Sequence, residues 1–334
     1  MRAMLLDRQA PIGTRPLEWC EVEAPRPGSQ ELLVRVSVCA VCRTDLHVIE
    51  GDLPARRLPL IPGHQIVGVV EARGANCERF AVGDRVGIGW LRRTCGRCDD
   101  CAAGRENLCR SSRYTGYHAD GGYAELTVVP EAFAYGLPGS MPDAEVAPLL
   151  CAGIIGFRAL ARAELPPGGR LGLFGFGSSA HVVLQLARHR GAEVLVATRG
   201  ENHRRMALDL GAAWVGQANE PMPRALDAAI VFAPAGAIVP LALERVRPGA
   251  TVALAGIHMS RLPEMDYERC LFHEKNLRSV EANTRLDGVA LLREAARVPI
   301  RPRVVRYRLA EANEVLIGLA ESRIDGTAVL SCPA

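Results

Sequence analysis

The sequence predicts an α/β protein with two domains, one rich in short β-strands and one built on a doubly wound parallel sheet. The first third of the chain carries short apolar segments separated by Pro and Gly turns, which is typical of a small barrel or sandwich. From Arg170 onward, apolar strand candidates alternate with segments of helical periodicity. The length of 334 residues also exceeds what a single hydrophobic core usually supports.

In the first third, turn residues mark where strands begin. We expect strands at Leu32–Val38, at Gly68–Glu71 after the turn Pro62-Gly63, and at Arg85–Gly89 after the turn that ends at Asp84.

Beyond Pro148 the alternation predicts repeated β-α-β units. The expected strands are Leu171–Phe174, Val194–Ala197, Ala228–Phe232 and Thr251–Ala255, and the expected helices are Ala180–His189, Glu201–Leu210 and Ile238–Val246. The last part is predicted to be extended over Val298–Arg308, helical over Glu311–Glu321 and a strand over Thr327–Leu330.

Composition argues against several classes of protein. Hydrophobic residues make up 49% and charged residues 23% of the chain, as in ordinary globular proteins, and the net charge of +3 is too small to indicate nucleic acid or an anionic membrane as partner. The N-terminus has no signal-peptide pattern, and the longest apolar run, Val146–Leu160, is broken by Pro, Gly and Arg and falls short of the ~20 residues that span a bilayer. Eleven cysteines, mostly in metal-like contexts, favour a reducing cytoplasm.

Four cysteines lie within fifteen residues, in the segment CGRCDDCAAGRENLC. Cys95, Cys98, Cys101 and Cys109 are spaced so that one tetrahedral ion can take all four thiolates, as structural zinc does. A pair of disulfides is the alternative, but three cysteines spaced two residues apart pair only with strain.

A glycine-rich turn follows the strand predicted at Leu171–Phe174. Gly175, Gly177, Ser178 and Ala180 form a G-x-G-x-x-A pattern between a strand and a helix, which indicates a dinucleotide site. The glycines allow the tight turn and the approach of a pyrophosphate, and the helix N-terminus offers N–H donors to it. A Gly-rich loop of an unrelated α/β domain is the alternative.

The end of the next strand indicates which dinucleotide is bound. An acidic residue there would favour NAD, but the chain has Thr198 followed by Arg199. A hydroxyl and a guanidinium suit a 2′-phosphate, so NADP is favoured, with NAD as the alternative. Nearby His203, Arg204 and Arg205 either assist or form the ordinary surface of the next helix.

Three further segments hold candidate metal ligands: CRTDLH gives Cys42, PGH gives His64 and LLCAG gives Cys151. Singly, each of these residues could be a buried thiol or a core histidine. Together with the four-cysteine segment, GDRV and the glycine-rich turn, these motifs resemble, in order and essentially from end to end, the zinc-dependent alcohol dehydrogenases of the medium-chain dehydrogenase/reductase superfamily. The likeness is greatest to bacterial enzymes of the propanol-preferring kind.

The resemblance implies a domain plan. Residues 1–148 and 284–334 would form a GroES-like catalytic domain, with a structural zinc lobe at 92–112, and residues 149–283 a Rossmann nucleotide-binding domain. The active site would lie in the cleft between the two domains, and Arg323, in the segment SRIDGTAVL, would approach the cofactor. Relatives of this kind are homodimers or homotetramers.

The resemblance also assigns chemical roles to single residues. Cys42, His64 and Cys151 match the ligands of a catalytic zinc, which gives two zinc ions per chain with the one in the four-cysteine lobe. Thr44 matches the hydroxyl that takes the alcohol proton, His47 the histidine that passes it on, and Asp45 the carboxylate that orients His64. The implied reaction is reversible hydride transfer between primary or secondary alcohols and NAD(P)+, giving aldehydes or ketones.

Two residues depart from the family pattern. Three others stand at positions that line the substrate pocket in the family. Gln65 replaces the glutamate that usually follows the ligand histidine, and Ile155 replaces a threonine near the nicotinamide. Trp90 matches an aromatic residue of the alcohol site. Ile49 and Leu53 stand where relatives with narrow pockets carry tryptophan, so we expect a wider pocket unless other side chains fill the space.

Two other functions remain as alternatives, one that shares all of these motifs and one that shares some of them. An NADPH-dependent aldehyde reductase of the cinnamyl-alcohol dehydrogenase type shares every one of them. A zinc-ribbon scaffold that kept a Rossmann domain would share the four cysteines, but the Cys42, His64 and Cys151 set and the lack of a sustained basic face argue against it.

Overall fold

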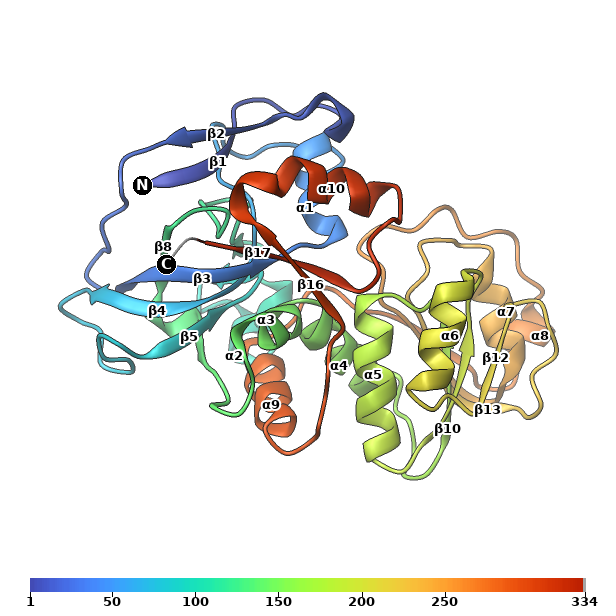
Figure 1. Cartoon of the computed structure of the whole chain (residues 1–334). Coiled ribbons are helices and arrows are strands. Elements are labelled where there is room, and N and C mark those ends of the chain that lie inside the picture. The colour runs from blue at the N-terminus through green and yellow to red at the C-terminus, as the bar shows by residue number, and fades with distance from the viewer. Residues whose placement is uncertain (333–334) are drawn as a thin grey trace. The chain divides into compact units, whose positions relative to one another are not determined.

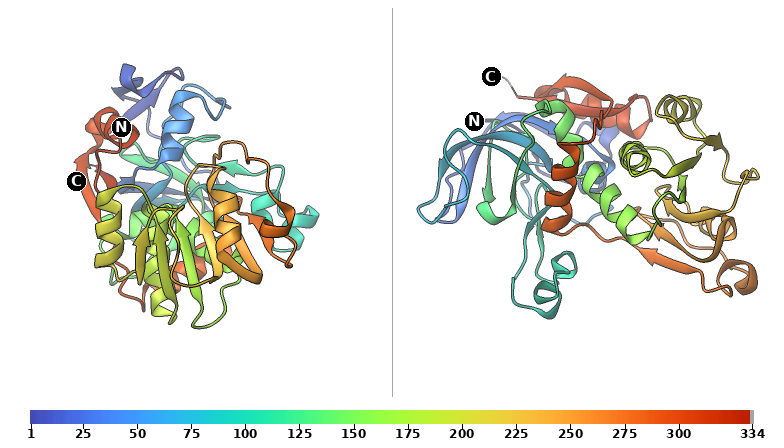
Figure 2. Two further views of the ribbon diagram at one scale, coloured as in Figure 1. Left: turned by 90° about the vertical axis from the view of Figure 1, so that its right-hand side faces the viewer. Right: turned by 90° about the horizontal axis from the view of Figure 1, so that it is seen from below.

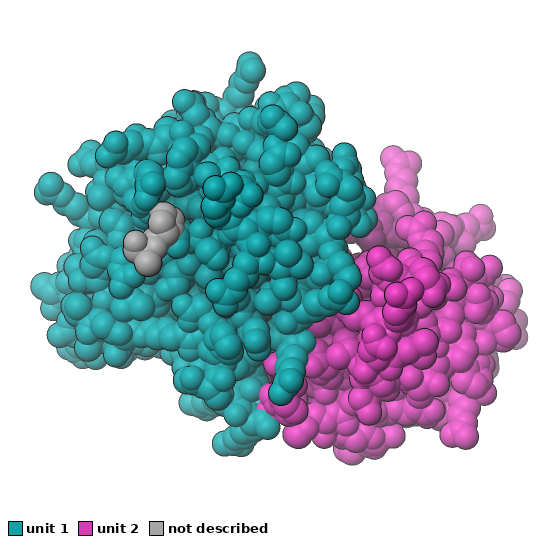
Figure 3. Space-filling view, in the orientation of Figure 1, with its two compact units in different colours: residues 1–151, 282–297, 301–334 teal, residues 152–281, 298–300 magenta. Residues whose placement is uncertain are grey.

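The computed structural model describes residues 1–332 and contains two compact units (Figures 1 and 3). Unit 1 comprises Met1–Cys151, Ala282–Arg297 and the chain from Arg301 to the end of the described part. Unit 2 comprises Ala152–Glu281 and the short segment Val298–Ile300.

Unit 1 is built on a seven-stranded sheet with the order β16-β17-β3-β4-β5-β9, in which β8 also pairs with β3. The strands are β3 (Glu31–Ala40), β4 (Gln65–Arg73), β5 (Arg85–Ile88), β8 (Leu126–Pro130), β9 (Ala134–Gly136), β16 (Val304–Arg308) and β17 (Thr327–Ser331). In β3, the side chains of Leu32, Val34 and Val36 are buried while Arg35 faces outward, which is the alternation expected of a strand with one face on a core.

Two small antiparallel pairs complete the strands of unit 1. They are β1 (Arg2–Leu6) with β2 (Leu17–Glu21), and β6 (Leu91–Arg93) with β7 (Arg113–Tyr114). The helices of unit 1 are α1 (Arg43–Glu50), α2 (Asp99–Ala102), α3 (Asp143–Val146), α9 (Arg285–Ala295) and α10 (Ala312–Ala320). Five 3-10 turns join these elements, at Ile12–Thr14, Glu106–Leu108, Glu131–Phe133, Ala147–Leu150 and Leu309–Glu311.

Unit 2 contains a six-stranded, fully parallel sheet with the order β12-β11-β10-β13-β14-β15. The strands are β10 (Arg170–Phe174), β11 (Glu193–Ala197), β12 (Trp214–Gly216), β13 (Leu226–Val231), β14 (Val246–Leu254) and β15 (Asn276–Ser279). Counted from β10, this is the strand order 3-2-1-4-5-6 of the dinucleotide-binding fold, so the predicted doubly wound sheet is confirmed.

The helices of unit 2 are α4 (Ala152–Arg162), α5 (Ser178–His189), α6 (Glu201–Asp209), α7 (Ile238–Arg245) and α8 (Tyr267–Cys270). Helices α6 and α7 lie on opposite faces of the sheet (Figure 2). This is expected because the crossovers are right-handed and the strand order runs outward from β10 in both directions. The central strands are therefore covered on both sides, which is why β10 and β13 are continuous apolar runs.

Within residues 1–332, no single helix is long and apolar enough to cross a membrane. The two consecutive helical segments Asp143–Leu150 and Ala152–Arg162, which are bent relative to each other, are together long and apolar enough.

The segment predicted to be extended over Val298–Arg308 forms a strand only from Val304. Pro299 and Pro302 have no N–H to donate to a ladder, so pairing cannot begin before them.

Candidate functional site

Asp45 holds together two candidate metal ligands. Cys42 is the N-cap of α1, and its backbone N–H donates to Asp45 Oδ2 at 2.9 Å, while the other carboxylate oxygen, Oδ1, lies 3.0 Å from Nδ1 of His64. One buried carboxylate therefore closes the capping box of a helix and orients an imidazole from another part of the chain.

His64 follows a turn that only glycine can make. Gly63 has a φ of +93°, and a Cβ at this position would lie 2.4 Å from the ring of Tyr123, so the turn is both left-handed and covered by an aromatic ring. With Nδ1 occupied by Asp45, Nε2 faces the sulfur of Cys42 at 3.5 Å.

Cys151 completes a group of three. It follows the 3-10 turn Ala147–Leu150, and its sulfur lies with Cys42 Sγ and a ring nitrogen of His64 in a cluster whose ligand atoms are all within 4.8 Å of one another. A sulfur and a nitrogen that share a tetrahedral zinc lie about 3.6 Å apart, given bonds of about 2.3 and 2.0–2.1 Å. The observed 3.5 Å fits such an ion.

The charges of this cluster favour a cation. Hydrogen bonding from Cys151 and the proximity of His64 hold the pKa of the Cys42 thiol well below its usual value, although burial opposes this. Burial also opposes a charged imidazole, yet the negative charges of Asp45 and Cys42 raise the pKa of His64 to about 10. The charges that stabilise a proton here would equally stabilise a divalent metal ion, which deprotonated thiolates bind.

Thr44 and His47, predicted to relay a proton, lie on α1, the helix whose N-cap is Cys42. Thr44 is buried in the first turn of α1, and its hydroxyl contacts the Cys42 sulfur. His47 is in the last turn, where its Nδ1 lies 2.7 Å from Oδ2 of the exposed Asp52. Sequence reasoning missed Asp52, because an acid five residues away across a helix end is not a recognised spacing.

The side chain of Gln9 fixes the loop that carries Asp52. Its Nε2 donates to the carbonyls of Val48 (2.6 Å) and Leu53 (2.8 Å), and its Oε1 accepts from the N–H of Ala55 at 3.0 Å. This residue, more than thirty positions upstream, was also not predicted.

An aromatic group lies beside His64. The ring of Trp90 is edge-on to His64 at 4.9 Å and is stacked on Tyr114 at 4.9 Å and on Tyr117 at 5.9 Å. Leu53 packs in the same hydrophobic cluster as Trp90. Ile49 does not: it is fully buried in the main core of unit 1, so we do not carry it forward as a pocket residue.

The four-cysteine segment forms a lobe that projects from the sheet of unit 1 (Figure 2, right). The sulfurs of Cys95, Cys98, Cys101 and Cys109 all lie within 4.8 Å of one another, and those of Cys95 and Cys101 are 3.9 Å apart. Two sulfurs on a tetrahedral zinc are separated by about 3.8 Å, whereas a disulfide needs about 2 Å. All four cysteines are free, so this geometry fits a closed metal site and not the disulfide alternative.

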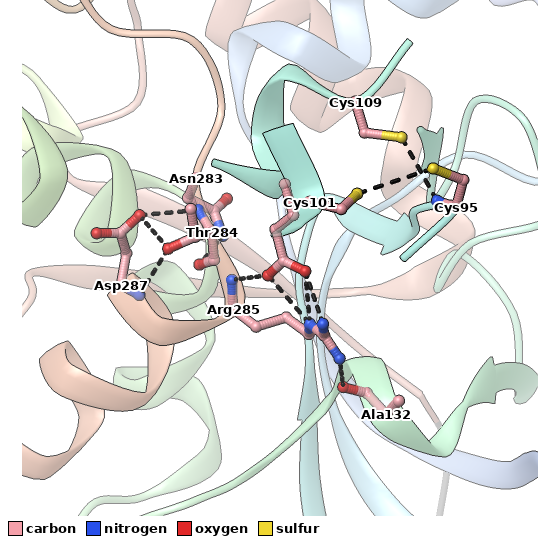
Figure 4. A network of polar contacts seen from close by, with 9 residues as sticks. Cys95, Cys101, Cys109, Ala132, Asn283, Thr284, Arg285 and Asp287 are labelled. Atoms are coloured by element: carbon pink, nitrogen blue, oxygen red, sulfur yellow. Dashed lines mark hydrogen bonds and ion pairs between the residues drawn. The ribbon is translucent and has the colours of Figure 1, made fainter. Parts of the chain in front are cut away.

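An ion pair between the buried Glu106 and the partly exposed Arg285 anchors this lobe to α9 (Figure 4). Glu106, between Cys101 and Cys109, accepts hydrogen bonds of 2.7–3.0 Å from the guanidinium and the backbone N–H of Arg285, the first residue of α9. Arg285 also lies over the ring of Phe133 at 4.5 Å. Because a bidentate pair has fixed geometry, it sets the orientation of the lobe on unit 1.

In unit 2, the glycine-rich turn joins β10 to α5 as predicted. Gly175 has a φ of +91°, and a Cβ there would lie 2.8 Å from the backbone nitrogen of Ala233. Gly177 is the N-cap of α5, and a Cβ at this position would enter open space, which leaves the helix N-terminus accessible to a phosphate. Ser178 begins the helix, and Ala180 is fully buried against the sheet.

The residues predicted to select the dinucleotide follow β11. Thr198 is buried, and its carbonyl accepts a hydrogen bond of 3.0 Å from Nε of Arg204. Arg199 is exposed, and no partner is found for its guanidinium among residues 1–332. Arg204 thus supports the backbone of this strand end, whereas the guanidinium groups of Arg199 and Arg205 are exposed and have no partner among residues 1–332.

Two other predicted positions have simpler surroundings. Arg323, in unit 1, forms an ion pair with Glu321. Gln65 is fully buried, and neither its amide nitrogen nor its carbonyl oxygen has a hydrogen-bond partner among the described residues.

Comparison with known proteins decides the family. Residues 28–139 match the family described as "Alcohol dehydrogenase GroES-like domain", and residues 180–296 match "Zinc-binding dehydrogenase". The chain is also 52% identical to "Probable alcohol dehydrogenase AdhA" of Mycobacterium tuberculosis, over 99% of this chain and 97% of that protein. The chain belongs to the zinc-dependent alcohol dehydrogenases of the medium-chain dehydrogenase/reductase superfamily. Zinc and a nicotinamide dinucleotide are accordingly its cofactors.

Solved structures support the same fold for this oxidoreductase. A cinnamyl alcohol dehydrogenase from Sorghum bicolor is 27% identical, with a TM-score of 0.89 over 99% of this chain and 97% of that chain. A cobalt- and zinc-bound thermostable alcohol dehydrogenase from Pyrobaculum aerophilum is 27% identical, with a TM-score of 0.87 over 99% of both chains.

The position of Asp45 generates a test. We expect Asp45→Asn to weaken zinc binding at the Cys42, His64 and Cys151 cluster by about 10- to 100-fold, because the carboxylate that fixes His64 is lost. Zinc per chain, measured after dialysis against a chelator, should fall by one relative to the wild type. Asp209→Asn, at an exposed position in unit 2, is the control and should retain all of its zinc. Equal zinc retention in Asp45→Asn and wild type would contradict this role.

Proposed function

We propose that this chain catalyses reversible hydride transfer between primary or secondary alcohols and NADP+, giving aldehydes or ketones, with one catalytic and one structural zinc. The observation that carries the proposal is the convergence of two thiols and one imidazole, from three separate segments, on a point where a buried carboxylate orients the imidazole. Three protein ligands leave a fourth position for the substrate, as catalytic zinc sites require. The four-cysteine lobe supplies a closed shell, as structural sites do.

The protein residues in this proposal bind, orient and move a proton. Zinc at the cluster would act as a Lewis acid that favours loss of the alcohol proton, while the nicotinamide accepts the hydride. Thr44 would take that proton, and His47 would pass it toward solvent. Asp52, whose Oδ2 lies 2.7 Å from Nδ1 of His47 and which is largely exposed, would orient the imidazole.

The two units take different parts in this proposal. Unit 1, with both cysteine clusters, would be the catalytic GroES-like domain, and unit 2 the nucleotide-binding domain, in line with the division predicted at residues 148/149 and 283/284. Gly175, Gly177, Ser178 and Ala180 would bind the pyrophosphate, Thr198 and Arg199 the 2′-phosphate, and Arg323 would contribute from unit 1. We also propose a homodimer or homotetramer and a cytoplasmic location.

The aromatic cluster supports a second candidate, an NADPH-dependent aldehyde reductase of the cinnamyl-alcohol dehydrogenase type. Trp90, edge-on to His64, stacks with Tyr114 and with Tyr117, so these rings together would give an aromatic substrate an aromatic surface beside the candidate zinc ligand. The smaller Leu53 in the same cluster would widen the pocket beyond what ethanol needs. The relative efficiency of the two reaction directions distinguishes these candidates.

The central test combines zinc content with turnover. We expect two zinc ions per chain and NADP-dependent oxidation of a series of primary and secondary alcohols, with efficiency rising from ethanol to larger alcohols. Cys151→Ser should lose one zinc and nearly all turnover because it removes a ligand, whereas Cys20→Ser, outside both clusters, should keep both. A wild-type chain with one zinc and no turnover would favour the scaffold alternative, and best activity on ethanol would contradict the wide pocket.

Cofactor choice is tested through Arg199. We expect a higher kcat/KM with NADPH than with NADH, and we expect Arg199→Gln to lower the NADPH value by roughly tenfold while leaving the NADH value nearly unchanged, since a charged hydrogen bond to the 2′-phosphate is lost. Arg224→Gln, an exposed arginine of the same unit, serves as the control. A wild-type preference for NADH, or an equal loss with both cofactors, would refute the assignment.

The Asp52 contact predicts a positioning role. Asp52→Asn should lower kcat for alcohol oxidation, but by less than the ~10²-fold that a positioned base itself contributes. Asp52→Glu should restore part of the rate, and the KM for the alcohol should stay close to that of the wild type, because Asp52 acts only through His47. Gln9→Ala, which frees the loop, should reproduce the effect more weakly. A kcat for Asp52→Asn equal to that of the wild type would show that Asp52 has no part in proton transfer.

A further inference from the structure

A cluster of arginines lies on the ribbon that flanks the four-cysteine lobe. Strands β6 and β7 pair so that Arg93 and Arg113 are directly opposite, and the register shifts by one residue at Arg92. Like charges in directly opposed positions destabilise a strand pair. Two cations in these positions therefore need a compensating anion.

The surroundings do not supply that anion. A groove of about 580 Å³ is lined by Arg92, Arg93, Arg97, Arg113 and His118, and Glu31 is the one carboxylate among its lining residues. Glu31 is already engaged, because it accepts from Arg92 at 3.4 Å and from the N–H of Gly28 at 3.0 Å. The side chains of Arg93, Arg97 and Arg113 are exposed, and no hydrogen bond or ion pair is found for their guanidinium groups within residues 1–332.

Arg92 gives the groove a fixed base. Its guanidinium is mostly buried and donates to the carbonyl of Val128 as well as to Glu31, so it does not depend on solvent for its orientation. The hydroxyl-bearing residues Thr94 and Ser111 complete the polar lining. The groove thus combines the immobilised guanidinium of Arg92 with three guanidinium groups whose N–H donors are not engaged by the protein.

We propose that this groove binds a phosphate group carried by a small organic molecule, at a site that adjoins the four-cysteine lobe and includes none of Cys42, His64 and Cys151. Planar guanidiniums bind phosphate oxygens in pairs, and several together match a tetrahedral dianion better than a planar carboxylate. A volume of about 580 Å³ holds a molecule larger than the phosphate itself. The site does not depend on the alcohol dehydrogenase activity.

The main rival role for these arginines is to balance the charge of a metal bound to four thiolates. Cys95 is the one thiol that lines the groove. The backbone N–H groups of Arg97 and Cys98 hydrogen-bond to its sulfur, so neutral donors already surround this thiol. The opposed pair Arg93 and Arg113 is not needed for that purpose.

The groove is connected to the candidate active site by one stacked pair of rings. Arg113 is adjacent to Tyr114, whose ring stacks on Trp90 at 4.9 Å, and Trp90 is edge-on to His64. An anion that draws Arg93 and Arg113 together would alter the environment of Trp90. Its fluorescence is therefore a suitable signal.

The experiment uses the full-length zinc-loaded protein in low-salt buffer. Phenyl phosphate, inorganic phosphate, sulfate and acetate are titrated separately, with tryptophan fluorescence and calorimetry as the measurements. We expect saturable binding in the order phenyl phosphate, then phosphate and sulfate, then acetate. Binding should be weakened about tenfold by each of Arg93→Gln and Arg113→Gln, because each removes a charged hydrogen-bond donor, and it should also weaken as salt is added.

Arg26→Gln is the matched control, since it removes the same charge from an exposed arginine of unit 1 for which no partner is found among the described residues. Any binding of these anions at the nucleotide turn of unit 2 is common to all the variants and cancels in the comparison. Binding that is equal in Arg93→Gln, Arg113→Gln and Arg26→Gln would overturn the proposal. So would zinc loss in the groove variants without phosphate binding by the wild type, since that result assigns the arginines to the lobe.

Discussion

The candidate catalytic centre depends on a single buried carboxylate that serves two elements at once. Asp45 accepts the N–H of Cys42 at the start of α1 and, through its other oxygen, holds the imidazole of His64. A residue free to rotate could not do both, so the first turn of α1 and the turn at Gly63 are fixed relative to each other. The negative charge of Asp45 also raises the pKa of the His64 imidazole, against the effect of burial. The ligand geometry is thus set by helix capping and by charge together.

A single carboxylate also positions the four-cysteine lobe, but its partner there lies far away in the sequence. The lobe has little core of its own, so its orientation depends on Glu106, which Arg285 holds from 179 residues further along. After the parallel sheet the chain returns to unit 1, and this returning segment therefore helps to position the four-cysteine lobe. It gives the segment Ala282–Arg297 a structural task that its sequence alone does not indicate.

What could be predicted from the sequence follows from how local each signal is. The glycine-rich turn, the strands β10, β11 and β13 and the two cysteine sets were predicted because each depends on neighbouring residues or on a family motif. Helices α1, α4 and α9 were not, since their apolar spacing is interrupted by candidate ligands or by glycines. The antiparallel pair β1–β2 was missed because residues 7–16 separate its two strands and contain no short-turn motif. Asp52 and Gln9 were missed for the same reason, as their contacts with His47 and its loop join positions that no short motif links.

Gln65 illustrates how burial limits the charge that such a centre can hold. With two thiolates and a neutral imidazole bound to a divalent metal, the ligands alone balance the ion, and Asp45 adds one negative charge at a position that is 2% exposed. A glutamate in place of the fully buried Gln65 would add a second charge without a cation to pair with it, and an unpaired buried charge is costly. The carboxamide avoids this cost but leaves a donor and an acceptor without protein partners, which carries its own smaller penalty. Glutamine at this position therefore exchanges an electrostatic cost for a hydrogen-bonding one, and it leaves the centre with a less negative surrounding than the glutamate of its relatives would give.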